Sequence, residues 1–239
     1  MPTFIARARP AVLALLLAAG AAQAQVLPPT AKLAPGFSTR PVASRLVIIP
    51  ADLELYSISA GGVVEPRADW TEQAQKNLAA ALLRDIGRLG SNVSRIAPAQ
   101  MDEAELSEVA ALHRAVAGAI SMHHFGNLKL PTKNERLDWS LGAEAVAPLK
   151  AKTGADYALF SYLRDTYASS ERKMAMLGMA LIGAYLPGGE QRGYASLVDL
   201  NTGRVVWFSG LDRSWGDLRD GGKAAETVDA LLQGFPGQQ

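Results

Sequence analysis

Two runs of alternating apolar residues, joined by a tight turn, restrict the fold of this chain more than any other feature. Residues 192–199 and 204–211 alternate as strands do, and Asn201-Thr202-Gly203 between them favours a hairpin because Asn and Gly tolerate positive φ. A third apolar run, residues 156–167, indicates a further strand. Residues 154–209 therefore predict the centre of a β-sheet, and they contain no recognisable catalytic constellation.

Helical periodicity and shorter strand-like runs alternate through the rest of the chain. Asp69 and Glu72, spaced as a capping pair, open the most regular helical pattern. One strand is predicted over residues 45–57, with a break near Pro50, and another over residues 92–97. Helices are predicted at residues 69–89, 102–123, 141–152 and 222–232. This order predicts an α/β sandwich of one domain, residues 45–235, with a mixed sheet, a C-terminal antiparallel hairpin and helices packed on it.

The first 24 residues have the composition of a secretory signal peptide. Arg7 and Arg9 precede a short apolar stretch, and Ala22-Gln23-Ala24 resembles a cleavage site, so cleavage is expected between Ala24 and Gln25. We therefore expect a periplasmic protein. The proline-rich residues 25–44 are expected to form a flexible leader, and no transmembrane helix is expected in the mature chain.

Cysteine usage and charge exclude several classes of protein. The chain has no cysteine, which excludes disulfides, thiolate metal sites and a lipid-modified cysteine. Without the signal peptide, 22 basic residues face 23 acidic ones, so no basic surface for nucleic acid is expected. No cofactor is predicted.

The arrangement of predicted elements resembles a group of cell-envelope proteins. The residues that carry the resemblance are the strand at 46–49, the helix at 70–89, the junction at 154–159 and the hairpin at 197–207. The group comprises the curli secretion-channel lipoprotein, the lipoprotein activators of penicillin-binding proteins and the N-terminal domain of the translocation protein TolB. The resemblance implies a non-catalytic adaptor, channel subunit or activator. This chain differs from the lipoprotein members because it lacks the cysteine that carries the lipid.

The uncharged segment of residues 174–186 is the strongest candidate for a contact surface. It is too short to span a bilayer as a helix, and packing in the core is the favoured interpretation. The alternative is contact with a partner, a second copy or a membrane surface, because methionines adapt to varied surfaces. The candidate partner-binding residues are Met174, Met176, Met179, Ile182, Tyr185, Trp207 and Trp215.

The three histidines do not have the spacing of a metal site. His113 and His124 share a helix face but are separated by about 16 Å along the axis, too far to share one ion. Core or helix-end roles are favoured for both and for His123. A metal site with Glu135 or Asp138 is the alternative.

Short enzyme-like patterns support one alternative function, a serine hydrolase. Ser170 and Lys173 match the Ser-x-x-Lys pattern of acyl-enzymes that act on cell-wall substrates, and residues 152–154 match their Lys-Thr-Gly pattern. The order of the two patterns along the chain is reversed relative to those enzymes, however.

Residues 216–223 resemble a phosphate loop but lack the Ser or Thr after the lysine.

The sequence favours a periplasmic, non-catalytic module that binds another component of the cell envelope. Two alternatives remain open at this point: a hydrolase acting on cell-wall or ester substrates through Ser170 and Lys173, and a homo-oligomeric structural protein of the envelope.

Overall fold

Strand β6 (Tyr157–Ala168) lies at the centre of a mixed, eight-stranded sheet. The computed structural model describes residues 31–239. The strand order is β1-β8-β7-β6-β2-β5, while β3 pairs with β6 beyond the end of β2 and β4 pairs with β3. The remaining strands are β1 (Ala31–Leu33), β2 (Leu46–Ile48), β3 (Asp52–Ile58), β4 (Val64–Pro66), β5 (Val93–Arg95), β7 (Gly189–Asp199) and β8 (Val205–Arg213).

A break at Pro50 divides the parallel partner of β6 into two strands. Ile48 of β2 pairs with Leu159 of β6, and Asp52 of β3 pairs with Tyr162 of β6. The segment between Ile48 and Asp52 is therefore one residue longer than the segment of β6 that lies opposite it. Proline has no N–H to donate to a ladder, which explains why the extra residue falls there. The predicted strand with a break near Pro50 is confirmed.

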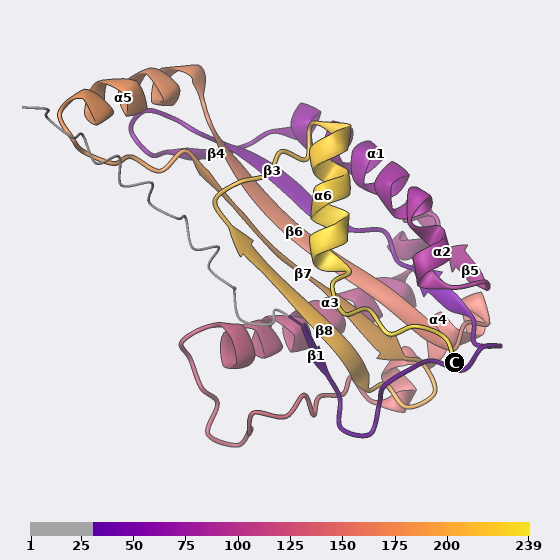
Figure 1. Cartoon of the computed structure of the whole chain (residues 1–239). Helices are drawn as coiled ribbons and strands as arrows, with labels where there is room; N and C mark the ends of the chain where they lie inside the picture. Colours follow the sequence, from indigo (N-terminus) through magenta and orange to yellow (C-terminus); the bar gives the residue numbers. More distant parts are fainter. Residues whose placement is uncertain (1–30) are drawn as a thin grey trace, which may run out of the picture.

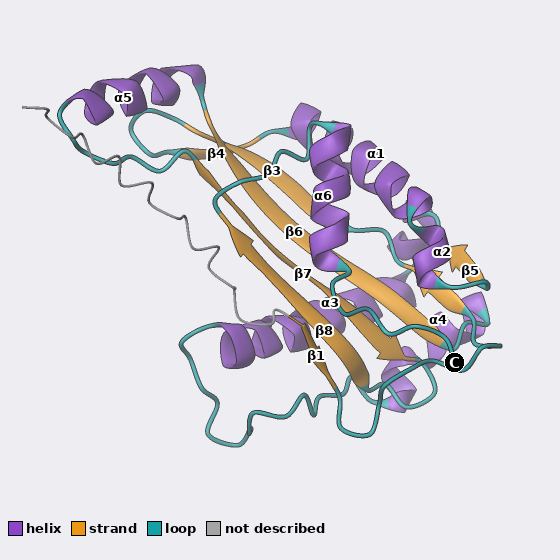
Figure 2. Cartoon of the chain, viewed as in Figure 1, coloured by secondary structure: helices purple, strands orange, loops and turns teal. Residues whose placement is uncertain are grey.

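Helices cover both faces of the sheet (Figures 1 and 2). One face carries α1 (Ala68–Arg84), α2 (Ile86–Leu89) and α6 (Gly221–Leu231). The other carries α3 (Ala104–Ile120), its π-helical continuation (Ser121–Phe125) and α4 (Ala143–Thr153). A short 3-10 helix (Pro98–Asp102) precedes α3, and α5 (Ser170–Leu181) extends beyond the end of the sheet. The predicted α/β class with a mixed sheet and C-terminal hairpin is confirmed.

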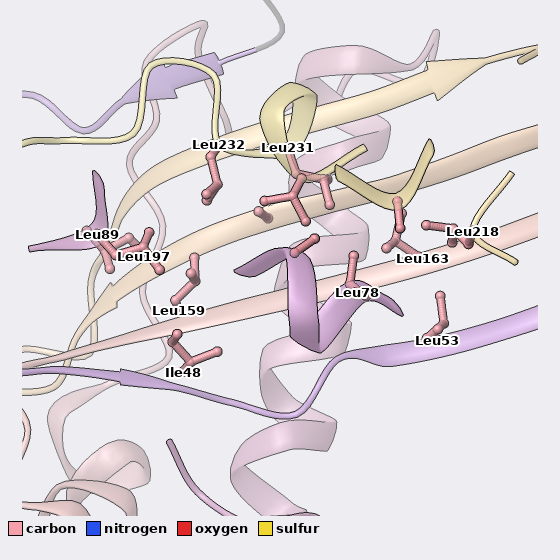
Figure 3. Packing of buried hydrophobic residues seen from close by; sticks show 14 of the residues in the cluster. Ile48, Leu53, Leu78, Leu89, Leu159, Leu163, Leu197, Leu218, Leu231 and Leu232 are labelled. Carbon is pink, nitrogen blue, oxygen red and sulfur yellow. The ribbon is translucent and has the colours of Figure 1, made fainter. Parts of the chain in front are cut away.

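Alternation along β6 divides the core into two layers. Leu159 and Leu163 pack with α1 and α6, whereas Ala158 and Phe160 pack with α3 and α4. Figure 3 shows the first layer, where leucines from the sheet meet those from the two helices. Two buried apolar layers on one sheet are expected from strands with alternating apolar faces.

Both ends of the described chain pack onto the sheet, which corrects the expectation of a flexible leader over residues 25–44. Residues 31–33 form β1 on the free edge of β8, and Ala34 and Arg40 are buried, so the flexible leader does not extend to residue 44. The last residues are also ordered, because Phe235 packs on Trp207 and Gln238 bonds to the backbone of Val42. An unpaired strand edge favours pairing even with a short segment. The composition of that segment does not show that such an edge is available to it. The predicted signal peptide, residues 1–24, lies outside the described residues.

The first helix begins differently from the prediction. It starts at Ala68, and Arg67 occupies the N-cap without a capping side chain. Asp69 instead pairs with Arg67 at 2.8 Å, and Glu72 pairs with Lys76 at 2.6 Å. The predicted capping box is therefore wrong, because ion pairs on the helix surface engage both acidic side chains. The helix itself is confirmed, with a break at Asp85.

Candidate docking site at the end of the sheet

Helix α5 forms where β6 passes beyond the layers of helices. Ser169 caps the helix by accepting a hydrogen bond from the backbone N–H of Arg172 at 3.2 Å, and Glu171 lies in the first turn. Both features favour a helix start. After the helix, Gly183 takes a positive φ of 75°, and the chain returns to β7.

Arg172 fastens α5 to the end of the sheet. Its buried side chain donates to the carbonyl oxygen of Pro187 at 2.9 Å and to that of Ser59 at 3.1 Å. The backbone N–H of Ser169 also donates to the carbonyl oxygen of Ile58 at 2.9 Å. Since these contacts reach both flanking segments, α5 has a fixed orientation relative to β3 and β7.

The apolar stripe of α5 faces away from the protein. Met174, Leu177 and Leu181 recur at helical spacing and are 68%, 59% and 83% exposed. Ile182 and Tyr185, which follow the helix, are also strongly exposed. We call these five residues the α5 surface. The favoured interpretation of residues 174–186 as core is wrong, because β6 and β7 place α5 beyond the helices that cover the sheet (Figure 1).

The other candidate contact residues differ in their positions. Met179 is exposed, whereas Met176 is half-buried beside Gly188. Trp215 is 57% exposed and follows β8 at the same end of the sheet as α5. Trp207 is fully buried against Phe235, with ring centroids 5.2 Å apart, so its expected place on a binding surface is wrong. Its ring lies on the face of β8 that packs under the C-terminal residues.

A β-hairpin contributes further exposed apolar residues at this end. Val63 and Val64 lie at the turn into β4 and are both exposed. The hairpin is joined to α5 through the hydrogen bond between Arg172 and Ser59. Exposed apolar groups from two segments therefore lie at one end of the sheet. Grouped apolar side chains are typical of an interaction site, whereas apolar residues scattered singly over a surface are not.

We expect replacement of Arg172 by methionine to release α5 while the rest of the domain stays folded. The change removes the two side-chain hydrogen bonds of Arg172 and should lower the free energy of unfolding by about 2 kcal/mol. Hydrogen exchange should become faster at the α5 amides and remain slow in β6. The control is Lys173→Met, which removes the neighbouring exposed cation. Equal exchange rates in the two variants would contradict this role for Arg172.

The hydrolase pattern is not assembled into a site. Ser170 and Lys173 are both exposed in the first turn of α5, and within residues 31–239 no hydrogen bond joins their side chains. The Lys-Thr-Gly pattern ends α4, which precedes β6, whereas α5 follows β6. A strand of 12 residues places the two patterns roughly 40 Å apart.

A buried serine–histidine pair was not foreseen from the sequence. His113 Nε2 lies 2.6 Å from Ser196 Oγ, and the imidazole stacks on Phe160 with centroids 3.9 Å apart. Burial lowers the pKa of His113 to about 3. The pair lies between α3 and the sheet, where a substrate has no access, so it stabilises the packing. The predicted core role of His113 is confirmed, and its position in the apolar helix stripe was the informative signal.

The other two histidines hold the connection between α3 and α4. The His123 ring accepts from the backbone N–H of Leu130 at 2.9 Å and lies 2.9 Å from the carbonyl oxygen of Asn134. His124 accepts from Trp139 at 3.0 Å, and burial lowers its pKa to about 4. In the described part of the chain, no three His, Cys, Asp or Glu side chains are placed to hold a metal ion.

The phosphate-loop resemblance also lacks a free site. Asp217 forms an ion pair with Arg219 at 2.7 Å, and Lys223 pairs with Glu226 at 2.7 Å. Asp220 caps α6 by accepting from the backbone N–H of Lys223 at 2.9 Å. The two cations of this segment, Arg219 and Lys223, are therefore engaged within the protein.

Across residues 31–239, no helix is both long and apolar enough to cross a membrane.

The chain was compared with known families and structures. No protein-family model matches it, and no curated protein sequence matches it. Its fold is similar to the PelC dodecamer from Paraburkholderia phytofirmans, with 14% identity over 87% of this chain and 96% of that chain and a TM-score of 0.41. It is also similar to the LpoB C-terminal domain from Salmonella enterica, with 10% identity over 75% and 87% of the two chains and a TM-score of 0.28.

A third similar structure is the lipoprotein GNA1162 from Neisseria meningitidis, with 14% identity over 80% of this chain and 94% of that chain and a TM-score of 0.31. All three TM-scores are below 0.5, so the similarity is distant and carries no information about a partner.

Proposed function

We propose that this protein is an exported, non-catalytic module of the periplasm that binds another cell-envelope protein through the α5 surface. The observation that carries the proposal is the exposed apolar stripe of Met174, Leu177 and Leu181 on a helix that Arg172 holds in place. Exposed apolar side chains on a fixed helix bind with little loss of conformational freedom. A helix that presents anchors at this spacing suits a groove on a partner.

The charges around α5 favour a protein partner over a lipid surface. Helices that lie on membranes carry several Lys or Arg residues on the polar face. In α5, Arg172 is buried, and the exposed Lys173 is balanced by Glu171 in the same turn. An anionic membrane therefore gains little from this helix, whereas an apolar groove on a protein matches the stripe.

The positions of the candidate nucleophiles support the proposal that this protein is not catalytic. Ser170 has no base within hydrogen-bonding distance among the described residues, and Ser196 is buried with His113. Nucleophilic catalysis requires the base in contact with the nucleophile and access for the substrate. Neither serine satisfies both conditions.

A photo-crosslinking amino acid placed at Leu181 in living cells tests the proposal. We expect a crosslink to a second envelope protein, identified by mass spectrometry, and none from the control position Val42, which is exposed near the C-terminal residues. A product containing only this chain would indicate a homo-oligomer, and a lipid adduct would indicate a membrane contact. Either result would contradict the proposed protein partner.

A further inference from the structure

A cleft of about 620 Å³ opens at the carboxyl ends of the parallel strands β2 and β5. Its apolar wall is formed by Ile48 of β2, by Leu78, Ala79 and Leu82 of α1, and by Ile96 and Pro98 after β5. Figure 3 shows Ile48 and Leu78 in the layer between the sheet and α1. The volume is within the range of about 300–1,000 Å³ typical of sites for small molecules.

The break at Pro50 explains why the cleft exists. Beyond Ile48 the chain steps from β2 to β3, and β5 at the edge of the sheet ends at Arg95. The sheet is therefore interrupted beneath α1 at this point. Carboxyl ends of parallel strands are the common location of ligand sites in α/β sheets.

Arg95 supplies an unpaired positive charge to the cleft. Its side chain is exposed, and among residues 31–239 it has no ion pair, hydrogen bond or ring contact. Two arginines of the neighbouring helices are engaged instead: Arg88 donates to the carbonyl oxygen of Leu232 at 2.8 Å, and Arg84 donates to that of Gly221 at 3.3 Å. Arg95 is thus available to an anion at the mouth of an apolar cavity.

We propose that this cleft binds one anionic single-chain amphiphile, a long-chain carboxylate. The tail would lie along Ile48, Leu78 and Leu82, and the carboxylate would accept hydrogen bonds from the Arg95 guanidinium. Burial of the chain supplies the affinity, and the charge-assisted hydrogen bonds orient the ligand. A peptide strand fits less well, because β5 offers an edge of only three residues.

This inference is independent of the proposed function. The cleft lies beside the pairing of β2 with the first residues of β6, whereas α5 follows the last residue of β6. Loss of the α5 surface therefore leaves the cleft intact, and a failure of either proposal is distinguishable from a failure of the other.

Calorimetric titration of the purified protein with dodecanoate, below its critical micelle concentration, tests the proposal. We expect one site with a dissociation constant between about 10 and 100 μM. Arg95→Gln should weaken binding about tenfold. The control Arg136→Gln removes an exposed arginine of the loop after α3 and should leave binding unchanged.

A second variant blocks the cavity without touching the charge. Ala79 is exposed on α1 and lines the cleft, so Ala79→Trp fills the space while far-UV circular dichroism confirms the fold. We expect this variant to lose dodecanoate binding. The proposal is overturned if dodecanoate fails to bind, if it binds the Ala79→Trp variant equally well, or if neutral dodecanol binds as tightly as dodecanoate.

Discussion

Substitution of Leu177 and Leu181 by glutamate is expected to abolish the complex with the envelope partner. The two side chains belong to the exposed stripe, and burial of each leucine in a partner contributes about 1.5–3 kcal/mol. Loss of both, together with the cost of burying carboxylates, corresponds to more than about a hundredfold weaker binding. A photo-crosslinker at Tyr185 reports the complex in living cells, and its yield should fall at least about tenfold.

The same double variant should fold as the wild type does. Both leucines are exposed and glutamate is a good helix former, so the free energy of unfolding should change by less than about 0.5 kcal/mol. The matched control carries Leu83→Glu and Leu112→Glu, at exposed positions of α1 and α3. Undiminished crosslinking from Tyr185 in the Leu177 and Leu181 variant would contradict the assignment of the α5 surface.

Local patterns were sufficient to predict the C-terminal hairpin and the break in the strand beside β6. The hairpin at residues 201–203 depends on Gly203, whose φ is 72° and whose added Cβ would lie 2.4 Å from the backbone of Gly142. The break at Pro50 follows from the missing N–H of proline. Such features are fixed by one or two residues, so they are visible in the sequence before any tertiary contact is known.

The residues of an apolar segment do not by themselves show whether the segment is buried or exposed in the fold. The spacing of Met174, Leu177 and Leu181 would suit a core helix equally well. Its exposure follows from the extension of β6 to Ala168, beyond the helices that pack on the sheet. In the same way, residues 31–33 look like linker in composition and become ordered because β8 presents a free edge. Both errors concern neighbours distant in sequence.

A buried carboxyl group was also not foreseen, since Asp165 lies within an otherwise ordinary strand. Asp165 is 1% exposed and accepts hydrogen bonds from the Tyr167 hydroxyl and, at 2.6 Å, from Gln191 Nε2. Burial raises its pKa from 3.8 to about 6, although both hydrogen bonds act in the opposite direction. The Tyr167 hydroxyl in turn accepts from the backbone N–H of Leu218 at 2.8 Å, so the group lies under the loop that leads to α6.

The raised pKa of Asp165 makes stability depend on pH. Because the folded protein binds this proton more tightly than the unfolded chain, the group stabilises the fold fully below about pH 4, and this stabilisation is lost as the pH rises through about 6. The loss amounts to about 3 kcal/mol, from the difference between the two pKa values. In Asp165→Asn the amide oxygen can accept the same two hydrogen bonds without ionising.

We therefore expect the free energy of unfolding of Asp165→Asn, relative to wild type, to rise by about 2 kcal/mol between pH 4 and pH 7. Urea unfolding at several pH values measures this difference directly, and any constant cost of repacking cancels because only the change with pH is used. The control Asp229→Asn removes an exposed carboxylate paired with Arg88 and should give a small difference at both ends of the range. A difference for Asp165→Asn that stays constant or falls as the pH rises would contradict this prediction. It would mean that the Asp165 carboxyl group ionises at least as easily in the folded protein as in the unfolded chain. The environment of this group would then be more polar than its contacts with Tyr167 and Gln191 indicate.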